Sequence, residues 1–201
     1  MSDDDDGDWP VELAGVTETL VTTLGPNDRW NVAALGVHAP SSSDDAATAT
    51  TWGNTRTRRN FEARGGGVVQ FCRDPELFVR GALEVYEVDD PVLPAAAAWV
   101  EVRADRTDTG EESGTRREEW RLLPEEVTVR ERVVPTLDRG VNAVVEATVA
   151  ASRLDVPAYD TDELLDRLAY LESVVESAGG PADRRAFERL SETTGWRERT
   201  G

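Results

Sequence analysis

Four arginines gather in one short polar stretch of the chain, WGNTRTRRNFEARGGGVVQF, residues 52–71. The arginines are Arg56, Arg58, Arg59 and Arg64, and two threonines and two asparagines lie among or next to them. If a helix begins near Thr55, its first turn offers unpaired backbone N–H groups, and threonine hydroxyls and arginines add further donors. Such a combination is typical of a phosphate site at a helix N-terminus.

The same stretch has a second interpretation that composition alone favours equally. The arginines could lie on an exposed helix and pair with surface carboxylates, which are abundant in this chain. There is no Walker lysine and no GxGxxG after a strand, so nucleoside-triphosphate hydrolysis and a Rossmann dinucleotide site are poorly supported. The glycines at 65–67 precede an apolar run and are expected to end the helix.

The balance of acidic and basic residues limits the kinds of molecule that this protein could bind. Forty acidic residues face 22 basic ones, for a formal net charge of -18, and every basic residue is arginine. This balance argues against a general nucleic-acid binder, whose affinity comes from basic groups that neutralise phosphates. Six tryptophans and periodic apolar runs argue against a disordered acidic chain. The composition resembles that of folded proteins from halophilic archaea that keep concentrated salt inside the cell, where salt screens the self-repulsion.

Cysteine and histidine are too scarce for several kinds of site. A single cysteine, Cys72, cannot form an internal disulfide, and with a single histidine, His38, the chain lacks a Cys/His zinc site. No metal is therefore expected. We interpret His38 as a strand-end residue and Cys72 as a small core residue rather than as catalytic groups.

The N-terminus does not have the pattern of a targeting segment. Residues 1–10 are acidic where a signal peptide needs a basic start and an apolar run, and they are expected to form a disordered leader. No run approaches the ~18 apolar residues of a membrane span. We therefore expect a cytoplasmic protein without membrane contact.

Strand patterns fill the first two thirds of the chain and helical patterns the last. Residues 16–40 predict a β-hairpin, 41–50 a polar loop, and 55–64 a helix. A strand is expected at 68–72, a helix after Asp74, and two strands joined by a loop at 108–114. Later stripes predict three helices; their residues are Val141, Val144, Val145 and Thr148, then Leu164, Leu168, Leu171 and Val175, with the third helix starting at Pro181.

Four segments in register give the chain a family resemblance. They are ETLVTT, NVAALGV, NTRTRRNFEARGGGVVQFCRDPELFVRGAL and LDRGVNAVVEATVAASRL, and the match covers roughly residues 16–155. They resemble the archaeal DUF447 family, whose members look like FMN-binding split barrels related to flavin reductases and pyridoxamine-phosphate-oxidase-like proteins. The resemblance implies an α+β fold, mainly antiparallel β: a six-stranded split β-barrel with short helices and a C-terminal helical segment. It also implies a homodimer that binds FMN at its interface.

The resemblance also implies which residues touch the flavin. The phosphate segment corresponds to Thr55, Arg56 and Thr57, with Asn60 one turn further along. The flavin ring or ribityl chain would be lined by Thr22, Thr23, Asn31, Ala33 and Ala34. The alternative role of the two alanines is ordinary strand packing.

The function expected from this resemblance is that of an FMN-binding flavoprotein, a reductase or oxidase of a small molecule with NAD(P)H as donor. The alternative is a non-catalytic module on the same barrel that binds a flavin or another phosphorylated ligand. A third possibility is a scaffold whose arginines serve only surface ion pairs. The expected domains are a leader at 1–10, the barrel at 11–135 and the helical segment at 136–201.

Overall fold

The computed structural model describes residues 9–42, 45–112 and 114–199. They belong to two compact units, one running to Arg73 and resuming at Tyr86–Val133, the other combining Asp74–Val85 with the chain from Val134 onward. The predicted division into 11–135 and 136–201 stays a prediction. Residues 1–8 of the predicted acidic leader lie outside the described residues, while Trp9 packs edge-on against the ring of Phe71.

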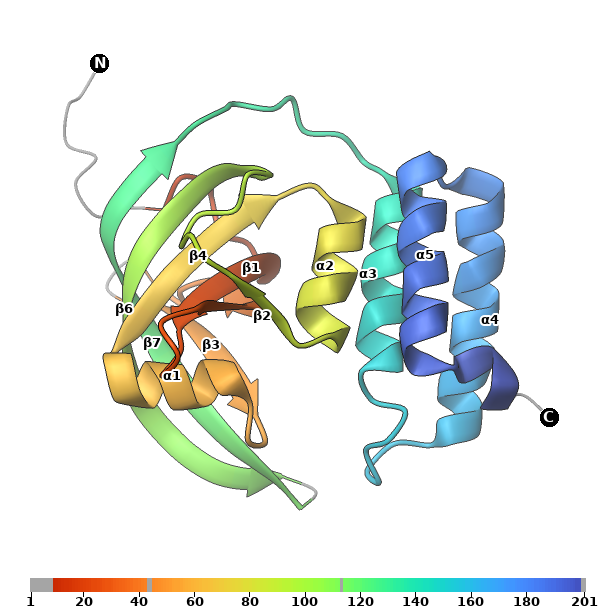
Figure 1. Cartoon of the computed structure of the whole chain (residues 1–201), viewed down its shortest axis with the longest axis horizontal. Helices are drawn as coiled ribbons and strands as arrows, with labels where there is room; N and C mark the ends of the chain where they lie inside the picture. The colour runs from red at the N-terminus through yellow and green to blue at the C-terminus, as the bar shows by residue number, and fades with distance from the viewer. Residues whose placement is uncertain (1–8, 43–44, 113, 200–201) are drawn as a thin grey trace. The chain divides into compact units, whose positions relative to one another are not determined.

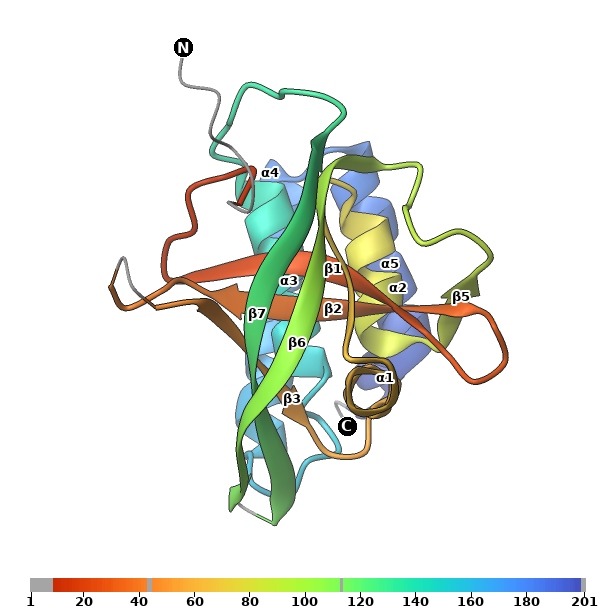
Figure 2. The ribbon, with the colours of Figure 1, turned by 90° about the vertical axis from the view of Figure 1, so that its left-hand side faces the viewer.

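The first unit is an antiparallel barrel. Its strands are β1 (Val16–Leu24), β2 (Trp30–His38), β3 (Ala47–Trp52), β4 (Gly66–Cys72), β5 (Tyr86–Val88), β6 (Ala96–Glu112) and β7 (Thr115–Val129). Six of them form a sheet in the order β1-β4-β6-β7-β3-β2. Pairing of β1 with β2 closes this sheet into a ring, and β5 pairs with β2. In Figure 2, the long strands β6 and β7 cross in front of β1 and β2. The predicted six-stranded α+β split barrel is confirmed.

The barrel is split where β2 meets β3. Those strands pair only at Val37 with Ala49 and at His38 with Thr48. By contrast, β6 and β7 stay paired from Ala98 with Val129 to Glu112 with Thr115. The predicted loop at 108–114 was therefore too long, because the strands continue almost to the turn.

Strand β3 corrects another sequence prediction. Residues 41–50 were expected to be a loop, yet β3 begins at Ala47. Ala47, Ala49 and Thr51 point into the protein, with Thr51 accepting a hydrogen bond of 2.9 Å from Trp120 Nε1. Alanine is depleted in strands, so the alternation of alanine and threonine gave only a weak strand signal.

Helix α1 (Arg56–Arg64) lies beside the barrel, as predicted for 55–64. Its Phe61 is 1% exposed and meets Trp120 in an edge-on arrangement, with 5.3 Å between the ring centroids. The helix ends at Gly65, whose φ of 77° lies in the left-handed region that favours glycine. Gly66 and Gly67 are not part of this stop, contrary to the sequence prediction, because they already belong to β4.

The second unit consists of helices α2 (Pro75–Leu83), α3 (Arg139–Ala151), α4 (Thr161–Ala178) and α5 (Pro181–Thr194), followed by a short 3-10 helix at Trp196–Arg199. Figure 1 shows α3, α4 and α5 side by side. The predicted α4 stripe is buried as expected, at Leu164, Leu168, Leu171 and Val175. On α3 the buried face is rotated toward Ala143, Val144, Ala147 and Thr148, and the predicted Val141 and Val145 lie at its half-buried edge.

One ion pair joins α5 to the end of α2. Arg189 donates from Nε to Glu84 Oε1 at 2.7 Å and from Nη2 to Oε2 at 3.1 Å. These hydrogen bonds hold the pKa of Glu84 below its ordinary value of 4.5. Because the folded pKa is the lower one, the pair contributes its full stability above pH 4.5 and loses it as the pH falls through the folded pKa.

Arg189→Gln is therefore expected to lower the free energy of unfolding at pH 7 by about 1 kcal/mol or less, since both side chains are partly exposed. The difference from the unmodified protein should shrink as the pH is lowered below 4.5. Chemical unfolding at a series of pH values measures it. Arg184→Gln is the matched control, because Arg184 donates to the backbone oxygen of Glu176 and its effect should not vary over this range. A pH-independent effect of Arg189→Gln would contradict the prediction.

Candidate functional site

The first turn of α1 presents backbone donors at the surface of the barrel. Thr55 caps the helix with an extended backbone, and its Oγ1 accepts the N–H of Arg58 at 3.3 Å. The N–H groups of Arg56 and Thr57 have no acceptor within the helix, since they lie in the first turn. Thr55 itself is exposed. This end of the helix therefore has the donors and the positive dipole end that a phosphate needs.

The arginines around that turn already have protein partners. Arg56 pairs with Glu87 on β5, and the Arg56 side chain is 42% exposed. Arg59 donates to the backbone oxygen of Asn54 at 2.7 Å. The expectation that surface arginines pair with carboxylates thus describes Arg56 in this structure. A phosphate at the helix end would compete with Glu87 for its guanidinium.

Beneath the turn lies a buried ion pair that sequence reasoning missed. Arg58 is 8% exposed, and its Nη1 lies 3.4 Å from Oε1 of Glu118, which is fully buried on β7. Arg106 and Arg116 approach the same Oε1. Arg58 also donates to Asn54 Oδ1 at 2.8 Å. The pair fixes the first turn of α1 to the wall of the barrel.

The pair leaves two buried atoms without a hydrogen bond in the described part of the chain, Arg58 Nε and Glu118 Oε2. A sequence signal for Glu118 did exist. It shares its strand face with the buried Trp120 and Leu122 at spacings of two and four. Period-2 counting along β7 would have placed this carboxylate inside.

A second link joins α1 to the first strand. Asn60 Nδ2 donates to Thr23 Oγ1 at 2.9 Å and to the Thr23 backbone oxygen at 3.3 Å. Thr23 in turn lies opposite Asn31 in the β1–β2 register. Three of the predicted site residues, Asn60, Thr23 and Asn31, are thus brought together, and all three are buried.

Thr22 faces a different set of partners. Its Oγ1 donates to the backbone oxygen of Pro91 at 2.5 Å and accepts from Gln70 Nε2 at 3.0 Å. The side chain has no exposed surface. Thr22 and Thr23 therefore hydrogen-bond protein atoms, and as they stand neither side chain is open to a ligand.

The remaining predicted residues are on the second strand and on α1. Ala33 and Ala34 are half-buried on β2, opposite Val21 and Leu20, and Ala33 packs against the barrel core. Thr57 is only 4% exposed. The groups of the predicted set that are available at the surface are thus Thr55 and Arg56, with the alanines partly so. Ligand contact by any of them stays a prediction.

His38 lies at the exposed end of β2, where a strand-end histidine was expected. It borders a hollow of about 550 Å³ together with Thr48, Thr50 and Glu119. Cys72 is half-buried at the end of β4. Within residues 9–42, 45–112 and 114–199, no group of three or more His, Cys, Asp or Glu side chains could hold a metal ion.

None of the helices in the described part of the chain is long and apolar enough to cross a membrane.

The closed antiparallel barrel with α1 beside its split defines a protein of the split-barrel class. Residues 17–131 match the family "Protein of unknown function (DUF447) N-terminal domain", and residues 138–192 match "Protein of unknown function (DUF447)". The chain belongs to the DUF447 family.

A solved structure of a DUF447 protein shares this fold. An FMN-bound DUF447 protein from Methanosarcina mazei superposes with a TM-score of 0.75 at 22% identity, over 90% of this chain and 96% of that one. The flavin reductase HpaC complexed with NADP+ gives 0.42 at 15% identity, over 61% and 84% of the two chains. The styrene monooxygenase flavin reductase from Pseudomonas putida gives 0.39 at 13%, over 60% and 94%. No curated protein sequence matches the chain.

Proposed function

We propose that this protein is an FMN-binding flavoprotein and that the N-terminal turn of α1 holds the FMN phosphate. The observation that carries the proposal is the exposed turn itself, with the Arg56 and Thr57 N–H groups free of helical acceptors and Thr55 at the surface. The FMN-bound family member with the same fold supports it.

The fit differs between the two ends of the flavin. At the phosphate end, Thr55 and the guanidinium of Arg56 can add to the backbone donors once Arg56 leaves Glu87. Thr57 acts through its N–H, because its side chain is buried. At the ring end, the half-buried Ala34 offers the close approach that a flat ring needs, while Ala33, on the opposite face of β2, packs against the barrel core.

The buried members of the set have a supporting role in this proposal. Asn60 and Thr23 hold α1 against β1, so they position the phosphate turn rather than touch the ligand. Asn31 and Thr22 stabilise the strands beneath the ring. Bound FMN supplies the redox chemistry, and the chain binds and orients it.

The proposal extends to the reaction and the assembly. NAD(P)H is the electron donor and a small molecule the acceptor, and two copies of the chain form a homodimer with FMN at the interface. Chemistry performed by the flavin fits a chain with one histidine and one cysteine. The excess of 40 acidic over 22 basic residues supports an origin in a haloarchaeal cytoplasm, where salt screens the repulsion.

The double variant Arg56→Ala, Thr57→Ala tests the phosphate site. It should raise the FMN dissociation constant by more than about tenfold, roughly 1.4 kcal/mol, because it removes the guanidinium and loosens the turn. Binding is measured by absorption of the flavin band during titration in molar KCl. Arg167→Ala is the control, since Arg167 makes a surface pair with Glu146 on the helical unit and FMN binding should not change.

Four outcomes test the parts of this proposal. An unchanged dissociation constant in the double variant would show that the Arg56 guanidinium does not bind the FMN phosphate. If the unmodified, folded protein retained no flavin, FMN would not be its ligand. Flavin that is bound but inert toward NAD(P)H would favour the non-catalytic module. Sedimentation of the FMN complex as a monomer would contradict an interfacial site.

A further inference from the structure

Glu87 on β5 joins the first turn of α1 to the turn between β1 and β2. Its Oε1 accepts a hydrogen bond from Nη1 of Arg56, the first residue of α1. Its Oε2 accepts from Asn27 Nδ2 at 3.2 Å and lies 3.9 Å from Arg29 Nε. Arg29 also donates from Nη2 to the Glu87 backbone oxygen at 3.3 Å. The two carboxylate oxygens of Glu87 are thus used separately, one by the helix and the other by the β1–β2 turn.

The pair between Glu87 and Arg56 can open at small cost. The Arg56 side chain is 42% exposed and that of Glu87 is 22% exposed. Both groups therefore keep contact with water, and ion pairs of this kind add little to stability. When the pair opens, Asn27 and Arg29 still hold Oε2 of Glu87. Glu87 can thus stay in place while the guanidinium of Arg56 turns to another anion.

A phosphomonoester is a stronger partner for Arg56 than the carboxylate of Glu87. At pH 7 it carries nearly two negative charges and three acceptor oxygens, whereas a carboxylate carries one charge. The N–H groups of the first turn and the positive end of the α1 dipole add to its attraction. Riboflavin, which lacks the phosphate, gains nothing at this turn and leaves the pair of Arg56 with Glu87 intact.

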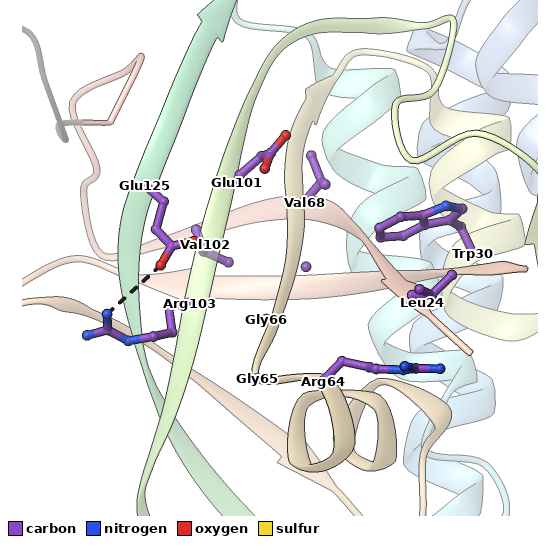
Figure 3. A pocket seen from close by; sticks show the side chains of 11 residues that line it. Leu24, Trp30, Arg64, Gly65, Gly66, Val68, Glu101, Val102, Arg103 and Glu125 are labelled. Carbon is purple, nitrogen blue, oxygen red and sulfur yellow. Dashed lines mark ion pairs between the residues drawn. The ribbon is translucent and has the colours of Figure 1, made fainter. Parts of the chain in front are cut away.

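Another arginine of the same helix has no such competitor. Arg64, in the last turn of α1, makes no ion pair or side-chain hydrogen bond within the residues that the structure describes. Figure 3 shows Arg64 at the border of a hollow of about 510 Å³, at the end of α1 opposite to Thr55. A helix of nine residues separates the two ends by ~13 Å. Arg64 is therefore a control for the general effect of an arginine on α1.

We propose, on the basis of the phosphate turn proposed above, that Glu87 competes with the FMN phosphate for the guanidinium of Arg56. In the free protein Glu87 occupies this guanidinium. In the FMN complex the phosphate takes its place, and Glu87 remains with Asn27 and Arg29. The competition lowers the affinity for FMN and leaves the affinity for riboflavin unchanged. Glu87 thus limits the preference for phosphorylated flavin, and FMN exchanges more readily than it would with an unpaired Arg56.

Glu87→Gln tests this competition, because it keeps the size of the side chain and removes its charge. The FMN dissociation constant should fall by about fivefold, since neither displacement of a carboxylate nor its repulsion then opposes binding. The riboflavin dissociation constant should stay the same. Both ligands are titrated through the absorption of the flavin band in one fixed salt concentration, and circular dichroism checks that the variant is folded.

Asp89→Asn is the matched control. It removes a negative charge two residues further along the chain, from a carboxylate that pairs with Arg29 at 2.9 Å. Arg64→Gln is the second control, and neither variant should change the preference for FMN over riboflavin. In an Arg56→Ala background, Glu87→Gln should no longer tighten FMN binding, because the group for which Glu87 competes is absent.

An FMN dissociation constant that Glu87→Gln leaves unchanged or raises would overturn the proposal. So would an equal effect on riboflavin, an equal effect of Asp89→Asn, or an effect that persists in the Arg56→Ala background. If the unmodified protein and Glu87→Gln both bound FMN and riboflavin equally, the phosphate turn itself would be wrong, and the competition with it. Tighter binding of FMN than of riboflavin, unaltered by Glu87→Gln, would leave the phosphate turn standing and remove only the role of Glu87.

Discussion

Glu118→Gln is expected to lower the free energy of unfolding by about 3 kcal/mol, near the lower end of the range for breaking a buried ion pair. The substitution keeps the shape of the side chain but leaves Arg58 charged and 8% exposed. The cost stays near the lower end because Arg58 keeps Asn54 and Glu62 as partners. Equilibrium unfolding in denaturant at fixed salt measures the loss.

Two further variants test whether the buried ion pair is the cause of this loss of stability. Glu119→Gln, at the next position of β7, removes a partly exposed carboxylate that pairs with Arg117 at 3.5 Å, and it should cost about 1 kcal/mol or less. Replacing both Arg58 and Glu118 by methionine should recover much of the stability, since no buried charge then remains unpaired. If Glu118→Gln cost no more than Glu119→Gln, the pair would not be what fixes α1.

Gly66→Ala is expected to cost about 3 kcal/mol, the upper end of the usual range for overpacking. Its Cβ would come within 2.1 Å of the Val102 backbone oxygen, and a backbone atom inside a strand cannot move aside as a side chain can. Gly66 lies opposite Arg103 in the β4–β6 register, so the strands would have to separate there. Thermal and denaturant unfolding both measure the effect.

Gly110→Ala is the matched control on β6. The nearest atom to its Cβ would be Arg117 Nη2 at 3.8 Å, an ordinary contact. An alanine there should be neutral or stabilise by about 0.4–1 kcal/mol, because it restricts the unfolded chain. Equal costs for the two substitutions would show that strand propensity, and not the close approach of Val102, makes Gly66 necessary.

Local signals were sufficient to predict much of this fold. The α1 helix was predictable because threonine at its cap and glycine after its end mark both termini. The α4 stripe was predictable because its leucines repeat at helical spacing. Strand β3 was missed because alanine and threonine alternate without a large apolar residue, and the strand owes its burial to partners such as Trp120 far along the chain.

The candidate site was predictable to a smaller extent. The turn that we propose for the phosphate could be named from the sequence because its donors are adjacent, from Thr55 to Thr57. The partners of its arginines could not be predicted from the sequence. Glu87 and Glu118 come from β5 and β7, and only the closed barrel brings them to α1. Burial of Thr22 likewise depends on Pro91 and Gln70, which local patterns do not connect to β1.

The strand pairings of the barrel differ in length and in the sequence separation of their strands. These differences set the order in which the barrel can form and open. The β1–β2 and β6–β7 ladders join strands that follow each other in the sequence, so their loops close at small entropic cost. The β3–β7 ladder joins Ala47 to Leu122, across most of the unit, and such distant pairings form slowly. The pairing between β2 and β3, called the β2–β3 joint, consists of two residue pairs and contributes little to holding the ring closed. The two hairpins therefore form before the ring closes, and the β2–β3 joint is the place where the folded barrel opens most readily.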